Sequence, residues 1–462
     1  MQNSTDGLPS PRRYQAVVAL SLGTVLAVID GTIVNVALPT LARDLGVEES
    51  SAVLVVTVYQ LVLMMTVLPF SALGSRIGLR RLYQYGQIIF TVSTVLCFFA
   101  KSLPFLLVVR ALQSLGAAAS LSVSSAMVRS IYPSRQLGRG LAFNNAVVQS
   151  AGALAPTLGG LVLGVASWPW LFAVATPLGL LSMWLGYRSL PQPEPIKEPY
   201  DVLGALLCAL TFGLIISGFE SAVHGDSPVV SLAIVAAGCV IAFIFVRRSL
   251  GEKSPILPVD LLAIPVVALS SIGSLLAFIG SMAFLLSLPF RLQQHYGFSP
   301  AEVGAVITPW PFAMMITAPL AGLLSDRFPA SILGAIGMTL ATTGLLLMAF
   351  LPGDATYIDI VWRMALCGAG FGFFFSPNVR LIISSTPIAR AASAGGLVST
   401  IRLTGHTLGA TLMSLLLTLK VGDGRVPALV AAALSILAGV CSVARINVTG
   451  HKVSRTDMPD ES

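Results

Sequence analysis

Apolar stretches long enough to cross a membrane recur along almost the whole chain, from near residue 14 to near residue 446, with only short polar breaks. A spanning helix needs about 20 mostly apolar residues. Hydrophobic residues make up 55% of the 462 residues and charged residues only 10%, whereas soluble domains have roughly 25% charged residues. The chain is therefore predicted to be an all-α integral membrane protein without a separate soluble domain.

Turn residues and charges divide this apolar sequence into predicted transmembrane helices. Their number is fourteen, and they cover residues 14–38, 52–73, 83–100, 104–128, 141–165, 168–188, 201–221, 228–247, 265–290, 301–324, 331–351, 357–382, 393–418 and 425–446.

The distribution of basic residues predicts the orientation of these helices. An even number of spans places both termini on one side, and Lys and Arg are enriched in cytoplasmic loops. Most of the 27 Lys and Arg fall on the side of the termini. The opposite loops carry Arg43, Lys101, Arg291, Lys420 and Arg425. Both termini are predicted to be cytoplasmic.

The net charge of +7 is spread over short loops, which argues against a nucleic-acid partner.

An internal repeat relates the first six helices to the last six. Arg110 precedes Gly116 in the fourth helix as Arg363 precedes Gly368 and Gly370 in the twelfth. Equivalent helices keep one orientation, so this is a parallel repeat. The predicted domains are a six-helix bundle over 1–190, a linker with two inserted helices over 191–263, a second six-helix bundle over 264–448 and a cytoplasmic tail over 449–462.

Ionisable side chains within the spans are the first candidates for function, because a charge in a bilayer is costly. Asp30 is the best candidate for a proton carrier, since burial and a nearby arginine act in opposite directions on a carboxyl group. Arg110 is its predicted partner in proton coupling. The alternative is that the two residues only hold the bundle together as a permanent ion pair.

Other polar residues of the spans are candidates for a substrate cavity. Arg402 and His406 share one helical face, and histidine titrates near neutral pH, although a buried histidine is often only a packing residue. Glu220 is expected to be an exposed charge at a helix end. The full set of cavity candidates is Asn35, Tyr59, Gln60, Gln113, Asn145, Gln149, Glu220, Asn378, Arg402 and His406.

The sequence contains no signature of an enzyme or of a nucleotide-driven pump. There is no Walker A sequence, and the glycine-rich run at residues 368–372 lies within a predicted membrane helix. The cysteines have no metal-site spacing. No catalytic residue, cofactor or metal is predicted, and transport would have to draw on an ion gradient or on a partner.

Four motifs, taken in order, resemble the major facilitator superfamily, in particular its fourteen-helix drug:proton antiporter branch. DGTIVNVALP at residues 30–39 is similar to the helix 1 signature of that branch, and SALGSRIGLRR at 71–81 to the gating motif between helices 2 and 3. RALQSLGAA at 110–118 is similar to the helix 4 motif, and GALAPTLGG at 152–160 to the antiporter motif of helix 5. The resemblance covers essentially the whole chain.

The resemblance implies the major facilitator fold, two six-helix bundles and two inserted helices, and multidrug efflux from the bacterial cytoplasmic (inner) membrane. The residues that match its gating motifs are Ser75, Arg76, Gly78, Arg80, Gly152, Pro156, Gly159, Gly160 and, in the second copy, Asp326 and Arg327. Two positions depart from the family pattern. Ser75 replaces an aspartate, and Ala155 replaces the glycine before the motif proline.

The predicted function is proton-coupled export of lipophilic, cationic drugs or biocides by alternating access, and hence drug resistance. The predicted partners are a small amphipathic substrate, protons and the lipid bilayer, with one chain working as a monomer. Two alternatives stay open. One is a proton-coupled importer of a nutrient or metabolite, because fold does not fix function, and the other is a non-transporting receptor or assembly protein.

Overall fold

The computed structural model describes residues 7–133, 136–192, 200–223, 225, 227–252, 256–325, 327–386 and 390–456. For residues 75, 125, 137–143, 145–146, 149, 153, 391–392 and 447–456 it describes the backbone alone. The fold is all-helical, as predicted, and each predicted span contains helix. By length and composition, 11 helices of the described residues can cross a membrane.

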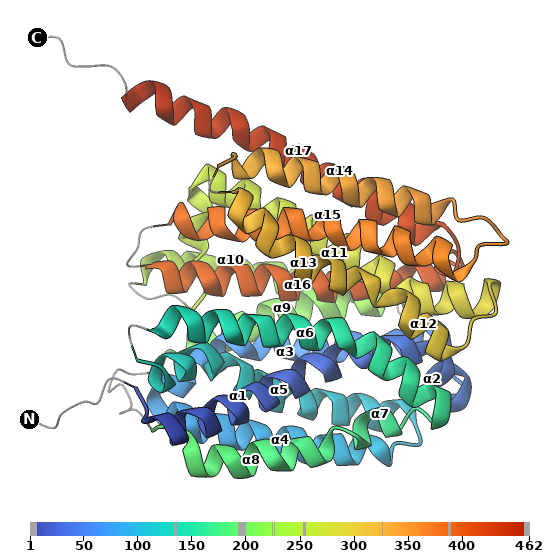
Figure 1. Ribbon diagram of the computed structural model, residues 1–462, viewed down its shortest axis with the longest axis horizontal. Coiled ribbons are helices and arrows are strands. Elements are labelled where there is room, and N and C mark those ends of the chain that lie inside the picture. The colour runs from blue at the N-terminus through green and yellow to red at the C-terminus, as the bar shows by residue number, and fades with distance from the viewer. Residues whose placement is uncertain are drawn as a thin grey trace, which may run out of the picture. The chain divides into compact units, whose positions relative to one another are not determined.

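The helices of the first part of the chain begin with a segmented span (Figure 1). They are α1 (Ser10–Ile33), the 3₁₀ segment η1 (Val34–Ala37), α2 (Leu38–Leu45), α3 (Glu49–Ile77), α4 (Leu79–Phe98), α5 (Leu103–Ile131), α6 (Leu137–Val165), α7 (Trp170–Ala173), α8 (Thr176–Ser189) and α9 (Val202–Val223).

The second part of the chain is also made of helices. Its elements are α10 (Pro228–Gly251), the 3₁₀ segment η3 (Val259–Ala263), α11 (Pro265–His295), α12 (Pro300–Ile307), α13 (Pro309–Leu324), α14 (Ala330–Ala349), α15 (Tyr357–Ser384), α16 (Ala391–Thr418) and α17 (Val426–Thr456).

Three spans predicted as single helices are interrupted close to a proline. Pro39 lies in the first turn of α2, Pro177 in that of α8, and Pro309 begins α13. Proline fits the first turn of a helix, but it has no backbone N–H and therefore cannot donate the i→i−4 hydrogen bond that would continue a preceding helix. The sequence-based ranges 14–38, 168–188 and 301–324 therefore include interruptions of the α-helix: the 3₁₀ segment η1, residues 174–175 between α7 and α8, and Thr308 between α12 and α13.

The chain divides into two compact units, Met1–Phe245 with Phe298–Ala305, and Val246–Gly297 with Val306–Ser462. In the first unit α4 and α5 cross closely at Gly116, which has no Cβ. A Cβ there would lie only 2.6 Å from the Gly86 carbonyl oxygen. In the second unit α14 and α15 cross in the same way, where a Cβ on Gly370 would lie 2.7 Å from the Gly337 carbonyl oxygen. The repeat seen in the sequence thus extends to how equivalent helices pack.

Candidate functional site

Asp30, Arg110 and Gln113 form a closed ring of hydrogen bonds inside the first unit. Arg110 Nη1 donates to Asp30 Oδ2 over 2.6 Å and to Gln113 Oε1 over 2.7 Å. Gln113 Nε2 donates to Asp30 Oδ1 over 2.9 Å. Arg110 and Gln113 are fully buried and Asp30 is 3% exposed. Asp30 and Arg110 thus form a buried ion pair between α1 and α5.

Neighbouring helices complete the surroundings of this ring. The Arg110 guanidinium lies over the Tyr59 ring of α3, 4.3 Å from its centroid, which is a favourable cation–π geometry. Gln113 Nε2 also donates to Thr94 Oγ1 on α4 over 2.8 Å. Tyr59 is itself fixed by a 3.1 Å hydrogen bond from its hydroxyl to the Ala27 carbonyl. Tyr59 and Gln113, both predicted to line a cavity, thus hold the ion pair in place.

The chemistry open to this ring is proton binding at Asp30. A buried carboxylate without a partner is strongly disfavoured, whereas a guanidinium at hydrogen-bond distance favours the charged form. Protonation of Asp30 removes one half of the ion pair and leaves a buried arginine to find other acceptors. An arrangement of this kind can link proton uptake at Asp30 to displacement of Arg110.

The second unit has a different arrangement at the repeat-related arginine. Arg363 pairs with Asp359 one turn earlier on the same helix, at 3.2 Å. This pair lies at the start of α15, where Asp359 also caps the helix together with Thr356. A charge pair within one helix end cannot join two helices, so the arrangement around Asp30 has no copy at this repeat-related position.

A second buried arginine, Arg445 of α17, was not predicted as a functional residue. It is 1% exposed and donates to Asn378 Oδ1, to Ser270 Oγ over 2.8 Å and to Ser442 Oγ over 2.5 Å. Asn378, a predicted cavity residue, also donates to Ser274 Oγ over 2.5 Å. This cluster ties α11, α15 and α17 together, and Asn378 lies buried within it.

Arg402 and His406 lie on α16 in the second unit, one helical turn apart. Arg402 is exposed and His406 is half-buried. The His406 ring lies nearly perpendicular to the Phe278 ring on α11, with centroids 5.3 Å apart. The two helices come close there because Gly405 faces Phe278, whose Cβ would lie 2.4 Å from an added Cβ.

The remaining cavity candidates fall into three groups. The buried oxygens Asn35 Oδ1 and Gln60 Oε1 accept no hydrogen bond from the described residues. Glu220 is only 9% exposed, so the expectation of an exposed helix-end charge is wrong, because this position lies on the buried face of α9. The side chains of Asn145 and Gln149 lie outside the described residues.

The first gating motif joins α3 to α4. Gly78 has φ +100°, a backbone conformation that a residue with a Cβ rarely adopts. The Arg76 guanidinium stacks 5.4 Å over the Tyr200 ring, and that of Arg80 stacks 5.4 Å over the Tyr187 ring and donates to the Tyr187 carbonyl. In the second copy Arg327 is exposed. Asp326 and the side chain of Ser75 lie outside the described residues.

The glycines of the antiporter motif differ in how closely they pack. A Cβ on Gly159 would lie 2.9 Å from the Ile33 carbonyl oxygen, and one on Gly160 2.8 Å from that of Pro300. Among the described residues, a Cβ on Gly152 would meet only Val28, at 3.8 Å. Ala155 before the motif proline is fully buried. Among these glycines the close contacts are therefore those of Gly159 and Gly160.

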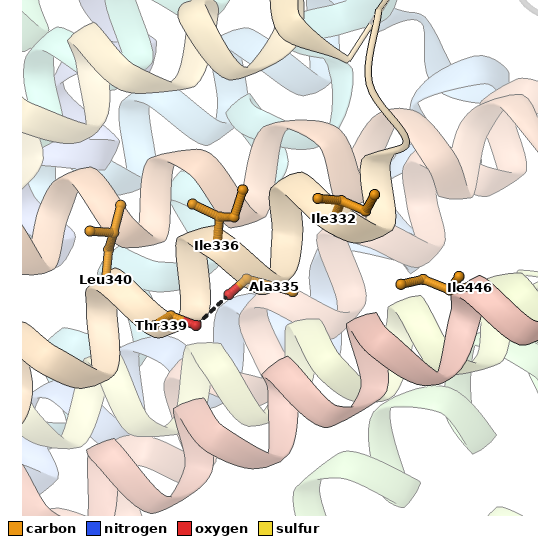
Figure 2. A pocket seen from close by; sticks show the side chains of 6 residues that line it. All are labelled: Ile332, Ala335, Ile336, Thr339, Leu340 and Ile446. Atoms are coloured by element: carbon orange, nitrogen blue, oxygen red, sulfur yellow. Dashed lines mark hydrogen bonds between the residues drawn. The ribbon is translucent and has the colours of Figure 1, made fainter.

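A pocket of about 370 Å³ lies on the second unit, apart from these polar residues. Figure 2 shows the residues that line it, which come from α14 and α17; the larger side chains are Ile332, Ile336, Leu340 and Ile446. Its apolar and largely exposed lining suits lipid contact and offers no charged group. In the described part of the chain, no three His, Cys, Asp or Glu side chains are grouped so that they could hold a metal ion.

Comparison with known families decides the class of this protein. The model of the Major Facilitator Superfamily matches residues 20–401 and, in a second match, residues 270–458. The chain belongs to the major facilitator superfamily. It is accordingly a multi-pass membrane transporter of a family without enzymatic activity.

Relatives within the major facilitator superfamily carry several kinds of name. The uncharacterized transporter YebQ of Escherichia coli K12 is 42% identical over 445 residues, 96% of this chain and 97% of YebQ. The riboflavin transporter RibZ of Clostridioides difficile is 28% identical, covering 87% and 88%. The multidrug export protein EmrB of Haemophilus influenzae is 27% identical, covering 86% and 78%.

A solved structure supports the same fold. The crystal structure of a bacterial homolog of the human lysosomal transporter Spinster, in an inward-facing and unoccupied conformation, matches with a TM-score of 0.67. The match covers 95% of this chain and 99% of the other at 16% identity.

Proposed function

We propose that this protein is a proton-coupled antiporter that exports lipophilic drugs or biocides from the bacterial cytoplasm by alternating access, one chain forming the pathway. The observation that carries the proposal is the buried ion pair between Asp30 and Arg110, 2.6 Å apart on different helices. The name of EmrB supports the direction of transport and the drug-like substrates.

In the proposed cycle Asp30 takes up a proton from the outer side and releases it to the cytoplasm. Protonation weakens the hold of Asp30 on Arg110, so that α1 and α5 are free to change their contacts. Each charge moved through 100 mV supplies roughly 2.3 kcal/mol, which corresponds to about 50-fold in concentration. One or two protons per cycle are enough for useful efflux.

The test uses everted membrane vesicles that hold a pH gradient reported by a fluorescent dye. Lipophilic cations, which the family resemblance favours, are added alongside dyes, biocides and acidic compounds. A transported compound should collapse the gradient in native vesicles and fail to do so with Asp30→Asn. The control is Asp354→Asn, because Asp354 is an exposed loop residue. Unchanged proton coupling in Asp30→Asn would mean that the ion pair is only structural.

A second candidate, import, is worth measuring because one relative is named for riboflavin. Labelled riboflavin and other nutrients are offered to intact cells with and without the protein. Accumulation of a nutrient, together with no effect of any compound on the pH gradient of everted vesicles, would replace export by import.

A further inference from the structure

One face of α16 is polar although the helix lies among membrane-spanning helices. Arg402 is exposed between the buried residues Ile401 and Leu403. Accessible residues continue this face at Ser399, one turn before Arg402, and at His406, one turn after it. A charged side chain at membrane depth faces the protein interior or a water-filled path rather than lipid. This face of α16 is therefore suited to meet a solute.

Aromatic rings flank the same face within the second unit. Phe278 of α11 stacks on Phe375 of α15 with centroids 4.1 Å apart and ring planes 13° from parallel. The His406 ring lies beside the Phe278 ring at an interplanar angle of 82°. Phe278, Phe375 and His406 are all half-buried, so their rings are partly accessible. Stacked, partly accessible rings of this kind offer a surface for a flat ligand.

The charge of this surface is positive. Among the described residues no carboxylate forms an ion pair with Arg402, whereas Arg363 and Arg390 of the same unit each have an aspartate partner. The acidic candidate Asp30 is buried and engaged by Arg110. An unpaired guanidinium recognises carboxylate-like groups by charge-assisted hydrogen bonds, and it repels cations.

We infer that Arg402, His406, Phe278 and Phe375 bind the exported compound, and that this compound is an organic anion with an aromatic ring. Its acidic group lies against Arg402 and its ring against Phe278 and Phe375. The inference rests on the proposed export function, and it assigns a negative charge where the family resemblance favours a positive one.

Three probes with one ring system and different charges test this inference: 2-naphthoate, the neutral 2-naphthylmethanol and the cationic 2-naphthylmethylamine. Their binding to purified full-length protein in lipid nanodiscs is measured by equilibrium dialysis, which does not depend on transport. The native protein should bind 2-naphthoate at least about 10-fold more tightly than the cation, because the charged hydrogen bonds form only with the anion.

Variants separate the charge from the rings. Arg402→Gln should weaken 2-naphthoate about 10-fold and leave the neutral alcohol within about two-fold. Arg402→Lys should keep most of the affinity, and Phe375→Leu should weaken all three probes. Arg425→Gln, at an exposed loop arginine, is the matched control. The inference is overturned if the native protein prefers the cation, or if Arg402→Gln binds 2-naphthoate as well as the native protein does.

The vesicle assay keeps this inference distinct from the proposed export function. Lipophilic cations that collapse the pH gradient through Asp30, while Arg402→Gln is without effect on any compound, would support export and overturn the anion site. Preferential binding of 2-naphthoate through Arg402, with no compound exported, would support the site and overturn the direction of transport.

Discussion

At the scale of single residues, the Asp30–Arg110 pair matters because the loss of either member leaves the other buried without its partner. Breaking such a pair from one side is expected to cost about 3–5 kcal/mol. Gln113, which bonds to both members, makes the two contributions depend on each other.

Asp30→Asn and Arg110→Gln are each predicted to lower the free energy of unfolding by about 3–5 kcal/mol. The double variant should lose clearly less than the sum, since it removes both charges together. Denaturant titration of the purified proteins in detergent measures all three values. If the two losses add to within about 0.5 kcal/mol, which is the behaviour of independent sites, the residues are not coupled.

Sequence reasoning named Asp30, Arg110 and Gln113 as candidates for function, but it did not name Arg445. Asp30 and Arg110 are charged residues within long apolar stretches, which is a strong indication of function in a membrane protein. Arg445 lies where the predicted helix ends, at a position from which a long basic side chain normally reaches toward water. Its burial depends on Ser270 and Asn378 of other helices, and no local pattern announces such tertiary partners.

At the scale of elements, close helix crossings set the positions of the charged residues. Gly116 lies on α5 less than two turns after Arg110, and a Cβ there would come within 2.4 Å of the Phe90 backbone nitrogen on α4. Backbone atoms cannot rotate away as side-chain ends can. The crossing therefore fixes how α4 presents Thr94 to Gln113.

Gly116→Ala is predicted to destabilise the protein by about 1–3 kcal/mol, as overpacking of a close contact does, and to slow Asp30-dependent transport. Gly152→Ala should be tolerated, because among the described residues its new Cβ meets only Val28, at 3.8 Å. Unfolding titrations and the vesicle assay compare the two variants. Equal tolerance of both substitutions would show that the α4–α5 crossing has room to relax.

The sequence predicted where helices occur better than where they are continuous. Each predicted apolar range contains helix, because a helix that crosses a membrane needs a long run of apolar side chains. The breaks at Pro39, Pro177 and Pro309 were missed, since other prolines, such as Pro69 and Pro289, lie inside unbroken helices. A proline is tolerated inside a spanning helix where other groups satisfy the carbonyl that it leaves free, and a sequence does not show where such groups lie.

At the scale of the whole molecule, the prediction that stands on charge alone is the orientation in the membrane. A green fluorescent protein fused after the C-terminus should fluoresce, because it folds in the cytoplasm, and alkaline phosphatase at the same place should be inactive. Fusions after Asp354, in the loop between α14 and α15, should behave in the opposite way. Active phosphatase at the C-terminus would reverse the predicted orientation.

The span that carries Asp30 also contains a change of helical winding. A 3₁₀ helix rises about 2.0 Å and turns about 120° per residue, against about 1.5 Å and 100° in an α-helix. Over the four residues of η1 the two windings differ by about 2 Å in length and about 80° in rotation. Rewinding Val34–Ala37 from a 3₁₀ helix to an α-helix would thus shorten the span, which draws α2 toward Asp30. It would also rotate α2 by nearly a quarter of a revolution. The chain would stay continuous across the membrane.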